Sequence, residues 1–247
     1  RLVDLSKLNC ILFRKDPPVN EKYIHMTHML DYLEQDGVLI INSPQSIRDF
    51  NEKLLGNNLT NHSVPTLVSS NQDIIISFIN KYKQVVVKPL NLMGGQDIIK
   101  LSYRDKSLSR KITNITQDAE KFIMVQKYLN QIKNGDTRIL IINGIVHEDV
   151  LVRYPPKNDF RANLSYGGKF EVKKIKYKHL SHLKDIGVFL KNNRIYFAGV
   201  DMIGDYITEI NITSPTGIQQ IETKDKYLSS KISKEFEKIV EQYYDDK

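Results

Sequence analysis

The dipeptide Asn143-Gly144 constrains the fold of this chain more than any other local feature, because it stands between two apolar runs in TRILIINGIVHEDVLVR. Asn and Gly both accept the positive φ angles of a type I′ turn, and such a turn joins two antiparallel strands through two residues. The segment therefore predicts a tight β-hairpin. A two-residue loop places Arg138 opposite Asp149.

The same hairpin decides which polar side chains share a face. Successive side chains of a strand alternate between faces, so Asp136, Arg138 and Arg153 are expected on one side. Two arginines on one face suit bidentate capture of a carboxylate or a phosphate. The alternative is two surface arginines, one of them paired with Asp149.

Hydrophobic periodicity in the rest of the chain predicts helices that alternate with mostly antiparallel strands, an α+β fold. A β-loop-α-β piece comes first, with Asn20 capping its helix, and Ser43-Pro44 starts the next helix. The Asn- and Gly-rich stretch 55–63 predicts a loop or a domain boundary. Expected helices cover 20–36, 44–54, 72–82, 179–192 and 229–243, and expected strands cover 8–13, 38–41, 85–87, 98–101, 121–126, 194–202 and 206–212.

Charge, apolar runs and cysteine content limit the binding partners and the cellular location that we expect. The net charge is +7, but the excess is lysine spread along the chain, so we expect no nucleic-acid partner. No apolar run approaches about 18 residues, so we expect no membrane span. The lone Cys10 has no internal disulfide partner, which fits a reducing, cytoplasmic location.

A candidate metal site lies near the end of the chain. Glu209 and Asn211 are two apart on an expected strand, so both side chains leave the same face. Asp201 faces Glu209 if the connecting loop is odd in length, as in a three-residue loop 204–206, or if one strand carries a bulge. Carboxylate and amide oxygens are the ligands that Mg²⁺ prefers. Three polar residues on a solvated strand face remain the alternative.

Two further features point to an anionic ligand. Lys88 ends the apolar run 85–87, and the nearby Gly94-Gly95 pair lets backbone N–H groups approach phosphate oxygens. The loop 154–169 carries Arg161 and Asn163 and follows a strand that bears an arginine, which is typical of a lid. A plain hairpin turn and a plain connector remain the alternatives.

Six segments of the chain, in this order, resemble those of bacterial glutathione synthetases, which belong to the ATP-grasp superfamily. They are RKDPP (14–18), NSPQSIRDFNEKL (42–54), VVVKPLNLMGGQDI (85–98), GDTRILIINGI (135–145), RANLSYGGK (161–169) and GVDMIGDYITEINITSPTGIQQIE (199–222). The resemblance implies an ATP-grasp fold, in which two α+β subdomains grip ATP, preceded by the remnant of an α/β lobe. We expect that lobe at 1–50, the small central subdomain at 51–128, and the C-terminal subdomain with the metal and peptide sites at 129–247.

The resemblance also implies roles for single residues. Asp201, Glu209 and Asn211 match the magnesium ligands, and Mn²⁺ is a possible substitute. Residues that match ATP contacts are Lys53, Lys88, Met93, Gly94, Gly95, Gln126, Lys127, Tyr128, Leu129 and Asp136. Arg138, Arg153, Arg161 and Asn163 match residues around the acyl phosphate and the peptide carboxylates, and Ser214, Pro215, Thr216 and Gly217 lie where the peptide is held.

The activity implied by the resemblance is ATP-dependent ligation of glycine to the cysteinyl carboxylate of γ-glutamylcysteine through an acyl phosphate, by a homo-oligomer. Two alternatives remain open at this point. One is another ATP-grasp carboxylate–amine ligase with a different acceptor. The other is a non-catalytic nucleotide-binding module, because family members usually carry a fuller lobe before RKDPP than residues 1–13 provide.

Overall fold

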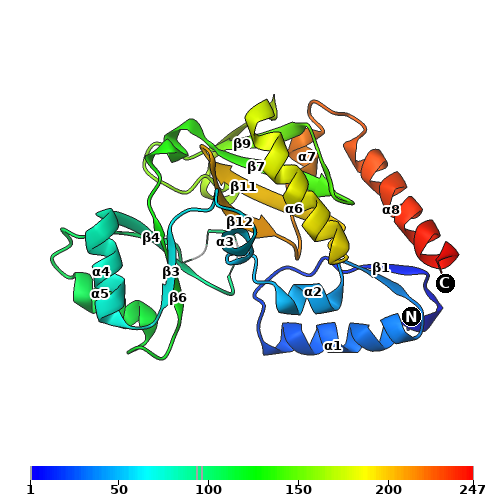
Figure 1. Cartoon of the computed structure of the whole chain (residues 1–247), viewed down its shortest axis with the longest axis horizontal. Helices are drawn as coiled ribbons and strands as arrows, with labels where there is room; N and C mark the ends of the chain where they lie inside the picture. Colours follow the sequence, from blue (N-terminus) through cyan, green and yellow to red (C-terminus); the bar gives the residue numbers. More distant parts are fainter. Residues whose placement is uncertain (1, 93, 96, 247) are drawn as a thin grey trace.

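Three β-sheets organise the part of the chain that the structure describes, which is residues 2–92, 94–95 and 97–246 of a computed structural model (Figure 1). The sheets follow one another along the chain, and each has its own apolar core. Within the described residues, none of the helices combines the length and the apolar character needed to cross a bilayer.

The first sheet pairs β1 (Cys10–Leu12) in parallel with β2 (Leu39–Ile41), and α1 (Glu21–Gln35) connects them. This is the predicted β-loop-α-β piece, although β1 is shorter than the expected strand and only partly buried. As predicted, the side chain of Asn20 accepts a hydrogen bond from a backbone N–H of the first turn of α1.

The second helix, α2 (Pro44–Asp49), is capped by Ser43 as predicted but ends before the expected residue 54. The side chain of Asn51 accepts a hydrogen bond from the N–H of Lys53, and such a turn competes with helical continuation. Where the sequence predicted a loop, α3 (Leu55–Leu59) forms instead. Leu55 is buried in the core of the third sheet, so packing outweighs the weak helix propensity of the Asn and Gly residues beside it.

The second sheet is antiparallel, and α4 (Gln72–Tyr82) and α5 (Leu108–Thr116) cover its outer face (Figure 1). Its strands run in the order β3 (Thr66–Ser69), β6 (Ile123–Lys127), β4 (Gln84–Pro89) and β5 (Ile99–Ser102). In β4 the alternation of side chains buries Val85 and Val87 under the helices. Val86 and Lys88 therefore face the other way, toward the third sheet.

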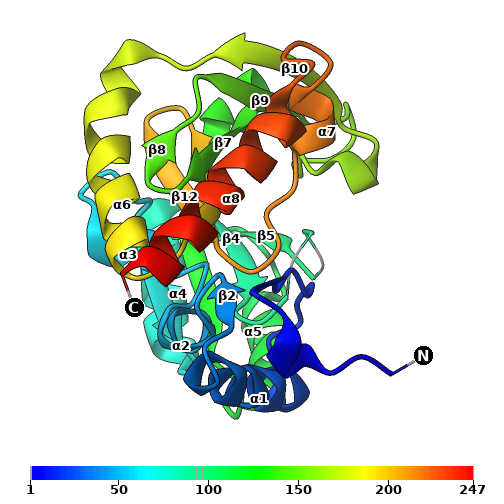
Figure 2. The same ribbon diagram turned by 90° about the vertical axis from the view of Figure 1, so that its right-hand side faces the viewer.

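The third sheet contains the predicted hairpin. Its strands run in the order β10 (Lys169–Lys174), β9 (Asp149–Tyr154), β7 (Asp136–Ile142), β11 (Phe197–Ile203) and β12 (Tyr206–Asn211), with β8 (Ile145–Val146) paired to β7. One face packs against α6 (Leu180–Asn192). Part of the other face is covered by α7 (Ile218–Ile221) and α8 (Leu228–Asp245), and α8 continues down to the first sheet (Figure 2). The second sheet lies opposite the part of that face that α7 and α8 leave uncovered.

The register of the hairpin differs from the predicted one by two residues. Arg138 pairs with Leu151, so its predicted pairing with Asp149 was wrong. The reason is that β8 and β9 are separate strands, with His147 and Glu148 between them. A shift of two residues leaves every side chain on its face. The predicted common face of the two arginines is therefore confirmed.

The turn itself forms as predicted, with Asn143 and Gly144 both at positive φ. It packs closely on α6 at Gly187. A Cβ added to Gly187 would lie 2.1 Å from the carbonyl oxygen of Gly144, far inside van der Waals contact. The hairpin and the helix therefore meet backbone to backbone.

We expect Gly187→Ala to lower the free energy of unfolding by about 1–3 kcal/mol, because the helix and the turn must separate to admit the methyl group. The neighbouring Val188→Ala is the control, since Val188 is 59% exposed. Urea unfolding followed by circular dichroism measures both. Equal stability of Gly187→Ala and the wild-type chain would contradict the close contact.

Candidate active site

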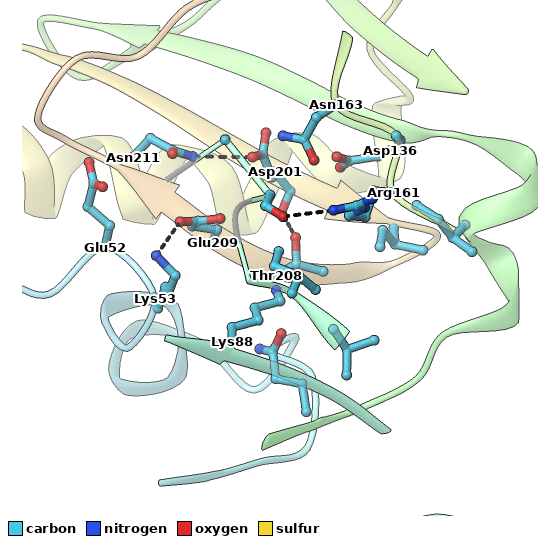
Figure 3. A pocket seen from close by; sticks show the side chains of 18 of the residues that line it. Glu52, Lys53, Lys88, Asp136, Arg161, Asn163, Asp201, Thr208, Glu209 and Asn211 are labelled. Atoms are coloured by element: carbon cyan, nitrogen blue, oxygen red, sulfur yellow. Dashed lines mark hydrogen bonds and ion pairs between the residues drawn. The ribbon is translucent and has the colours of Figure 1, made fainter. Parts of the chain in front are cut away.

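A cleft of about 1230 Å³, including the part open to solvent, lies between the second and third sheets (Figure 3). Most residues predicted from the sequence converge in it: Lys53, Lys88, Gly94, Gly95, Gln126, Lys127, Tyr128, Leu129, Asp136, Arg138, Arg153, Arg161, Asn163, Asp201, Glu209, Asn211, Ser214 and Thr216. Pro215 and Gly217 are not among the residues that line it. The predicted Met93 lies outside the described residues.

A row of charged side chains crosses the floor of the cleft. Asp201 pairs with Arg138 on β7 and with Glu209 on β12, so the three residues stand side by side on adjacent strands. The predicted facing of Asp201 and Glu209 is confirmed. It arises from a bulge in β12 at Thr208, not from a three-residue loop, because Ile203 and Tyr206 already pair across a two-residue turn.

Two arginines hold the carboxylate of Asp201. Arg138 donates from Nε and Nη2 to its two oxygens at 2.5 and 2.8 Å, and Nη2 of Arg153 lies 2.9 Å from Oδ1. All three side chains are less than a tenth exposed. Burial by itself would raise the pKa of Asp201, but the two guanidinium groups outweigh it and hold that pKa well below its usual value. Asp201 is therefore ionised and fixes both arginines.

Asp136 is the second acid beside Arg153, which donates to its Oδ2 at 2.5 Å. Its other oxygen, Oδ1, is buried and has no hydrogen-bond partner among the described residues. Burial raises the pKa of Asp136 against the opposing charge of Arg153, and the charge of Asp201 adds to the rise. Asp136 lines the cleft, and this oxygen is an unsatisfied buried acceptor beside it.

Two lysines approach this row of charged side chains from the opposite side of the cleft (Figure 3). The Nζ of Lys53 lies 3.5 Å from Oε1 of Glu209 and also donates to the carbonyl of Leu92. Lys88 reaches in from β4. Burial lowers the pKa of Lys88, Glu209 opposes the shift, and Lys53 adds to it. The two ammonium groups and the acids make a site for an anion accompanied by a cation.

Hard oxygen donors for that cation are present. Nδ2 of Asn211 donates to Oδ2 of Asp201 at 3.2 Å and to a backbone carbonyl, which leaves Oδ1 of the amide for an ion. The side chain of Glu209 is about one-fifth exposed, and among the described residues its one ion pair is the long contact with Lys53. The donor set therefore fits Mg²⁺. Of the two carboxylates in this set Glu209 is the freer, since the arginines occupy both oxygens of Asp201.

Two loops meet over the cleft at Gly95. Arg161 donates to its carbonyl from Nη1 at 3.4 Å, and the hydroxyl of Tyr166 donates to the same oxygen at 3.3 Å. Gly95 has φ +83°, and an added Cβ would lie 2.8 Å from Oδ1 of Asn163. Only glycine satisfies both the backbone angle and the close approach. The predicted glycine loop and the predicted lid loop are thus in direct contact.

Sequence reasoning missed the apolar wall of the cleft and the acid next to Lys53. Strand alternation was a usable signal for Val86, which shares a face with Lys88. The other members come from loops and from separate strands, where no periodic pattern marks them. The apolar wall encloses a slot beside the lysines and the acids, and this apolar slot fits the flat base of a ligand that also carries an anionic group. The missed apolar residues include Val64, Val86, Ile98, Ile132, Phe160 and Ile203, and the missed polar residues include Glu52 and Thr208.

The cleft lies between two α+β units and is lined by lysines, a glycine loop and the row of charged side chains. This combination defines an ATP-grasp protein. The fold is shared with the crystal structure of the D-cycloserine synthetase DcsG, with a TM-score of 0.65 at 13% identity over 86% of this chain and 78% of that one. It is also shared with the ATP-grasp ligase PsnB in complex with a minimal precursor, with a TM-score of 0.62 at 16% identity over 87% of this chain and 73% of that one.

Matches to family models identify the family of ATP-grasp proteins to which the chain belongs. Residues 52–226 match the model of the prokaryotic glutathione synthetase ATP-grasp domain, and residues 1–48 match that of the N-terminal domain. The chain belongs to the prokaryotic glutathione synthetase family. It is 38% identical to the glutathione synthetase of Coxiella burnetii, over 89% of this chain and 68% of that protein. It is also 38% identical to that of Prochlorococcus marinus, over 98% of this chain and 78% of that protein.

Proposed function

We propose that this chain is an ATP-dependent ligase that joins glycine to the cysteinyl carboxylate of γ-glutamylcysteine, giving glutathione, ADP and phosphate. The observation that carries the proposal is the cleft, where an apolar slot and two lysines adjoin a row of fixed arginines and acids. Relatives that are 38–42% identical and named glutathione synthetase support the choice of substrates.

The lining of the cleft favours one orientation of bound ATP. The base lies in the apolar slot. The N–H groups of Lys127 and Tyr128 are already bonded to backbone carbonyls there, whereas the N–H of Leu129 has no backbone partner among the described residues and is left for the base edge. The carboxylate of Asp136, which lines the cleft next to this slot, accepts a hydrogen bond from a ribose hydroxyl. The phosphates then reach Lys53, Lys88 and the glycine loop, which supply positive charge and backbone donors.

The residues that would hold Mg²⁺ are Glu209 and Asn211, with Asp201 behind them. When bound, the ion neutralises phosphate charge and helps to align the γ-phosphate for transfer. Mn²⁺ accepts the same hard donors, so we propose that it substitutes.

The chemistry has two steps. A carboxylate oxygen of the dipeptide attacks the γ-phosphorus, the bond from that phosphorus to the β–γ bridging oxygen breaks, and ADP leaves. The ammonium group of glycine gives one proton to solvent, and the free amine then attacks the carbonyl carbon of the acyl phosphate and passes a second proton to the departing phosphate. The C–O bond breaks, and phosphate departs with one oxygen of the original carboxylate. A carboxylate is a poor electrophile, and the first step supplies it with a good leaving group.

The chain itself contributes position and charge. Arg138 and Arg153, fixed by Asp201, face the transferring phosphoryl group and stabilise the charge that develops there. Arg161 and Asn163 come from the loop that touches Gly95, and they close the cleft against water. The segment 214–217 holds the peptide next to Arg138, whose Nη1 donates to the carbonyl of Thr216 at 3.1 Å.

The pH dependence of ATP binding tests the role of Lys88. Because burial lowers its pKa, this ammonium loses its proton at a lower pH than a free lysine does. Only the charged form attracts phosphate, so the affinity for ATP is expected to fall as pH rises through the lowered pKa. Lys88→Arg stays charged and is expected to hold its affinity to higher pH. Calorimetric titration between pH 7 and 10 measures both, and identical profiles would contradict the role.

A substrate panel tests the proposed activity. ADP release is measured with ATP, Mg²⁺ and γ-glutamylcysteine, with and without glycine, and with other amines and carboxylates in their place. The expected signal requires both γ-glutamylcysteine and glycine. Release with a different acceptor only would assign the chain to another ligase activity, and ATP binding without release would make it a nucleotide-binding module.

Further assignments rest on the family resemblance more than on the cleft. We propose subdomain limits near residues 50 and 128, a homo-oligomeric state, and a cytoplasmic location where ATP is available. Light scattering on the purified chain measures the oligomeric state directly.

A further inference from the structure

The segment 212–215 joins the metal ligand Asn211 to the proposed peptide site, and side chains from the first 52 residues hold it residue by residue. Asn42 donates from Nδ2 to the carbonyl of Ile212 at 2.7 Å. The hydroxyl of Ser214 donates to Asp16 at 2.5 Å, and Arg14 donates to the carbonyl of Pro215 at 2.7 Å. The remaining contacts belong to one carboxylate, that of Glu52.

Glu52 accepts three hydrogen bonds on a single oxygen. Its Oε1 takes the N–H of Ile212 at 2.7 Å and both the N–H and the hydroxyl of Thr213 at 2.8 Å. The backbone carbonyl of Glu52 also accepts the N–H of Ile210. Glu52 is only 9% exposed, and it stands beside Lys53 at the end of the cleft where Asn211 lies (Figure 3).

A carboxylate in this place is costly to the fold by itself. Burial raises the pKa of Glu52, the neighbouring charge of Glu209 adds to the rise, and the hydrogen bonds from residues 212–213 oppose it. A buried acid next to another acid is a poor packing choice compared with an apolar side chain of similar size. What the carboxylate provides is a rigid acceptor for two consecutive backbone N–H groups, and an apolar side chain cannot provide one.

We propose that Glu52 is a positioning residue for the ligase reaction: by fixing the backbone of Ile212 and Thr213, it sets both the metal-binding end and the peptide-binding end of the segment. The proposal rests on the proposed function. Glu52 acts through the segment, on Asn211 on one side and on residues 214–217 on the other. The connector that carries Lys53, proposed to bind phosphate, is tied to β12 separately, through the backbone carbonyl of Glu52 and the N–H of Ile210.

Glu52→Ala and Glu52→Gln separate positioning from general folding. Glutamine keeps an oxygen that accepts the two N–H groups, whereas alanine removes it. Since a misplacement of about 1 Å costs on the order of 100-fold, we expect Glu52→Ala to lower kcat about 30–100-fold and to raise the KM for γ-glutamylcysteine about tenfold. The KM for ATP should stay within about threefold, because Lys88, the apolar slot and the backbone hydrogen bond that holds the Lys53 connector to β12 are kept. Glu52→Gln is expected to restore most of the loss.

Hydrogen exchange gives a readout that does not depend on activity. The amides of Ile212 and Thr213 should lose protection in Glu52→Ala and keep it in Glu52→Gln. Asp49→Ala, which removes an exposed carboxylate at the end of α2, is the matched control and should change neither kinetics nor exchange. If Glu52→Ala does not fold, Thr213→Val removes one donor and should raise the dipeptide KM about threefold or more.

The outcomes distinguish this proposal from the proposed function. A wild-type chain that releases no ADP with γ-glutamylcysteine and glycine overturns the function, while the exchange experiment still tests the hold of Glu52 on the segment. Unchanged protection at residues 212–213 in Glu52→Ala overturns the positioning role. Equal rises in KM for ATP and for the dipeptide overturn it too, because a general loosening of the fold gives that result.

Discussion

Arg138→Ala is expected to slow ADP formation about 10²–10³-fold while the affinity for ATP changes by less than about threefold. The guanidinium of Arg138 is bonded to Asp201 and to the carbonyl of Thr216, on the peptide side of the cleft. Lys53 and Lys88, which we assign to phosphate binding, come from the other side. Charge stabilisation in the transition state is therefore lost, while binding of the nucleotide is kept.

Stability must be measured alongside the rate, because Arg138 belongs to a buried ion pair. Removing one partner of such a pair typically costs about 3–5 kcal/mol, although Arg153 still neutralises Asp201 here. Arg138→Lys keeps the charge and loses the bidentate contact, so an intermediate rate is expected. Arg104→Ala, which removes an exposed arginine after β5, is the control. Steady-state kinetics and calorimetry decide, and unchanged turnover in Arg138→Ala would refute the assignment.

Glu209→Gln is expected to slow turnover by a similar factor of about 10²–10³, for a different reason. The substitution keeps the size of the side chain and removes the charge of the freer of the two carboxylates in the donor set. The Mg²⁺ concentration needed for half-maximal turnover should rise about tenfold or more. Thermal stability should change little, because Glu209 is partly exposed and its ion pair with Lys53 is long, at 3.5 Å.

A Mg²⁺ titration of activity measures this shift. Glu171→Gln is the matched control, since Glu171 is an exposed glutamate on β10 of the same sheet. It should leave both the rate and the Mg²⁺ requirement unchanged. A wild-type Mg²⁺ requirement in Glu209→Gln would show that the ion is held elsewhere.

The sequence predicted those parts of the fold that local chemistry determines. The Asn143-Gly144 turn, the two side-chain caps and the length of α4 follow from residues close together in the chain. The two-residue shift in register was not predictable, because no local signal separates β8 from β9. Neither was α5, whose segment LSRKITNIT has weak helix propensity and is held by the burial of Ile112.

The candidate site likewise contains residues that the sequence predicted and residues that it did not. Strand alternation placed Asp136, Arg138 and Arg153 together, and the resemblance supplied the lysines and the proposed metal ligands. Glu52 escaped both, because its partners lie about 160 residues further along the chain and only the tertiary fold brings them together. Contacts of that range leave no periodic pattern in a sequence.

Transfer of isotopic oxygen tests the central claim most directly. γ-Glutamylcysteine labelled with ¹⁸O in both oxygens of its cysteinyl carboxylate is turned over with ATP, Mg²⁺ and glycine, and the released phosphate is analysed by ³¹P NMR. The account predicts one ¹⁸O in each phosphate formed, because the acyl phosphate gives up one carboxylate oxygen as it breaks. Phosphate without label, released at the rate at which glutathione forms, would contradict it.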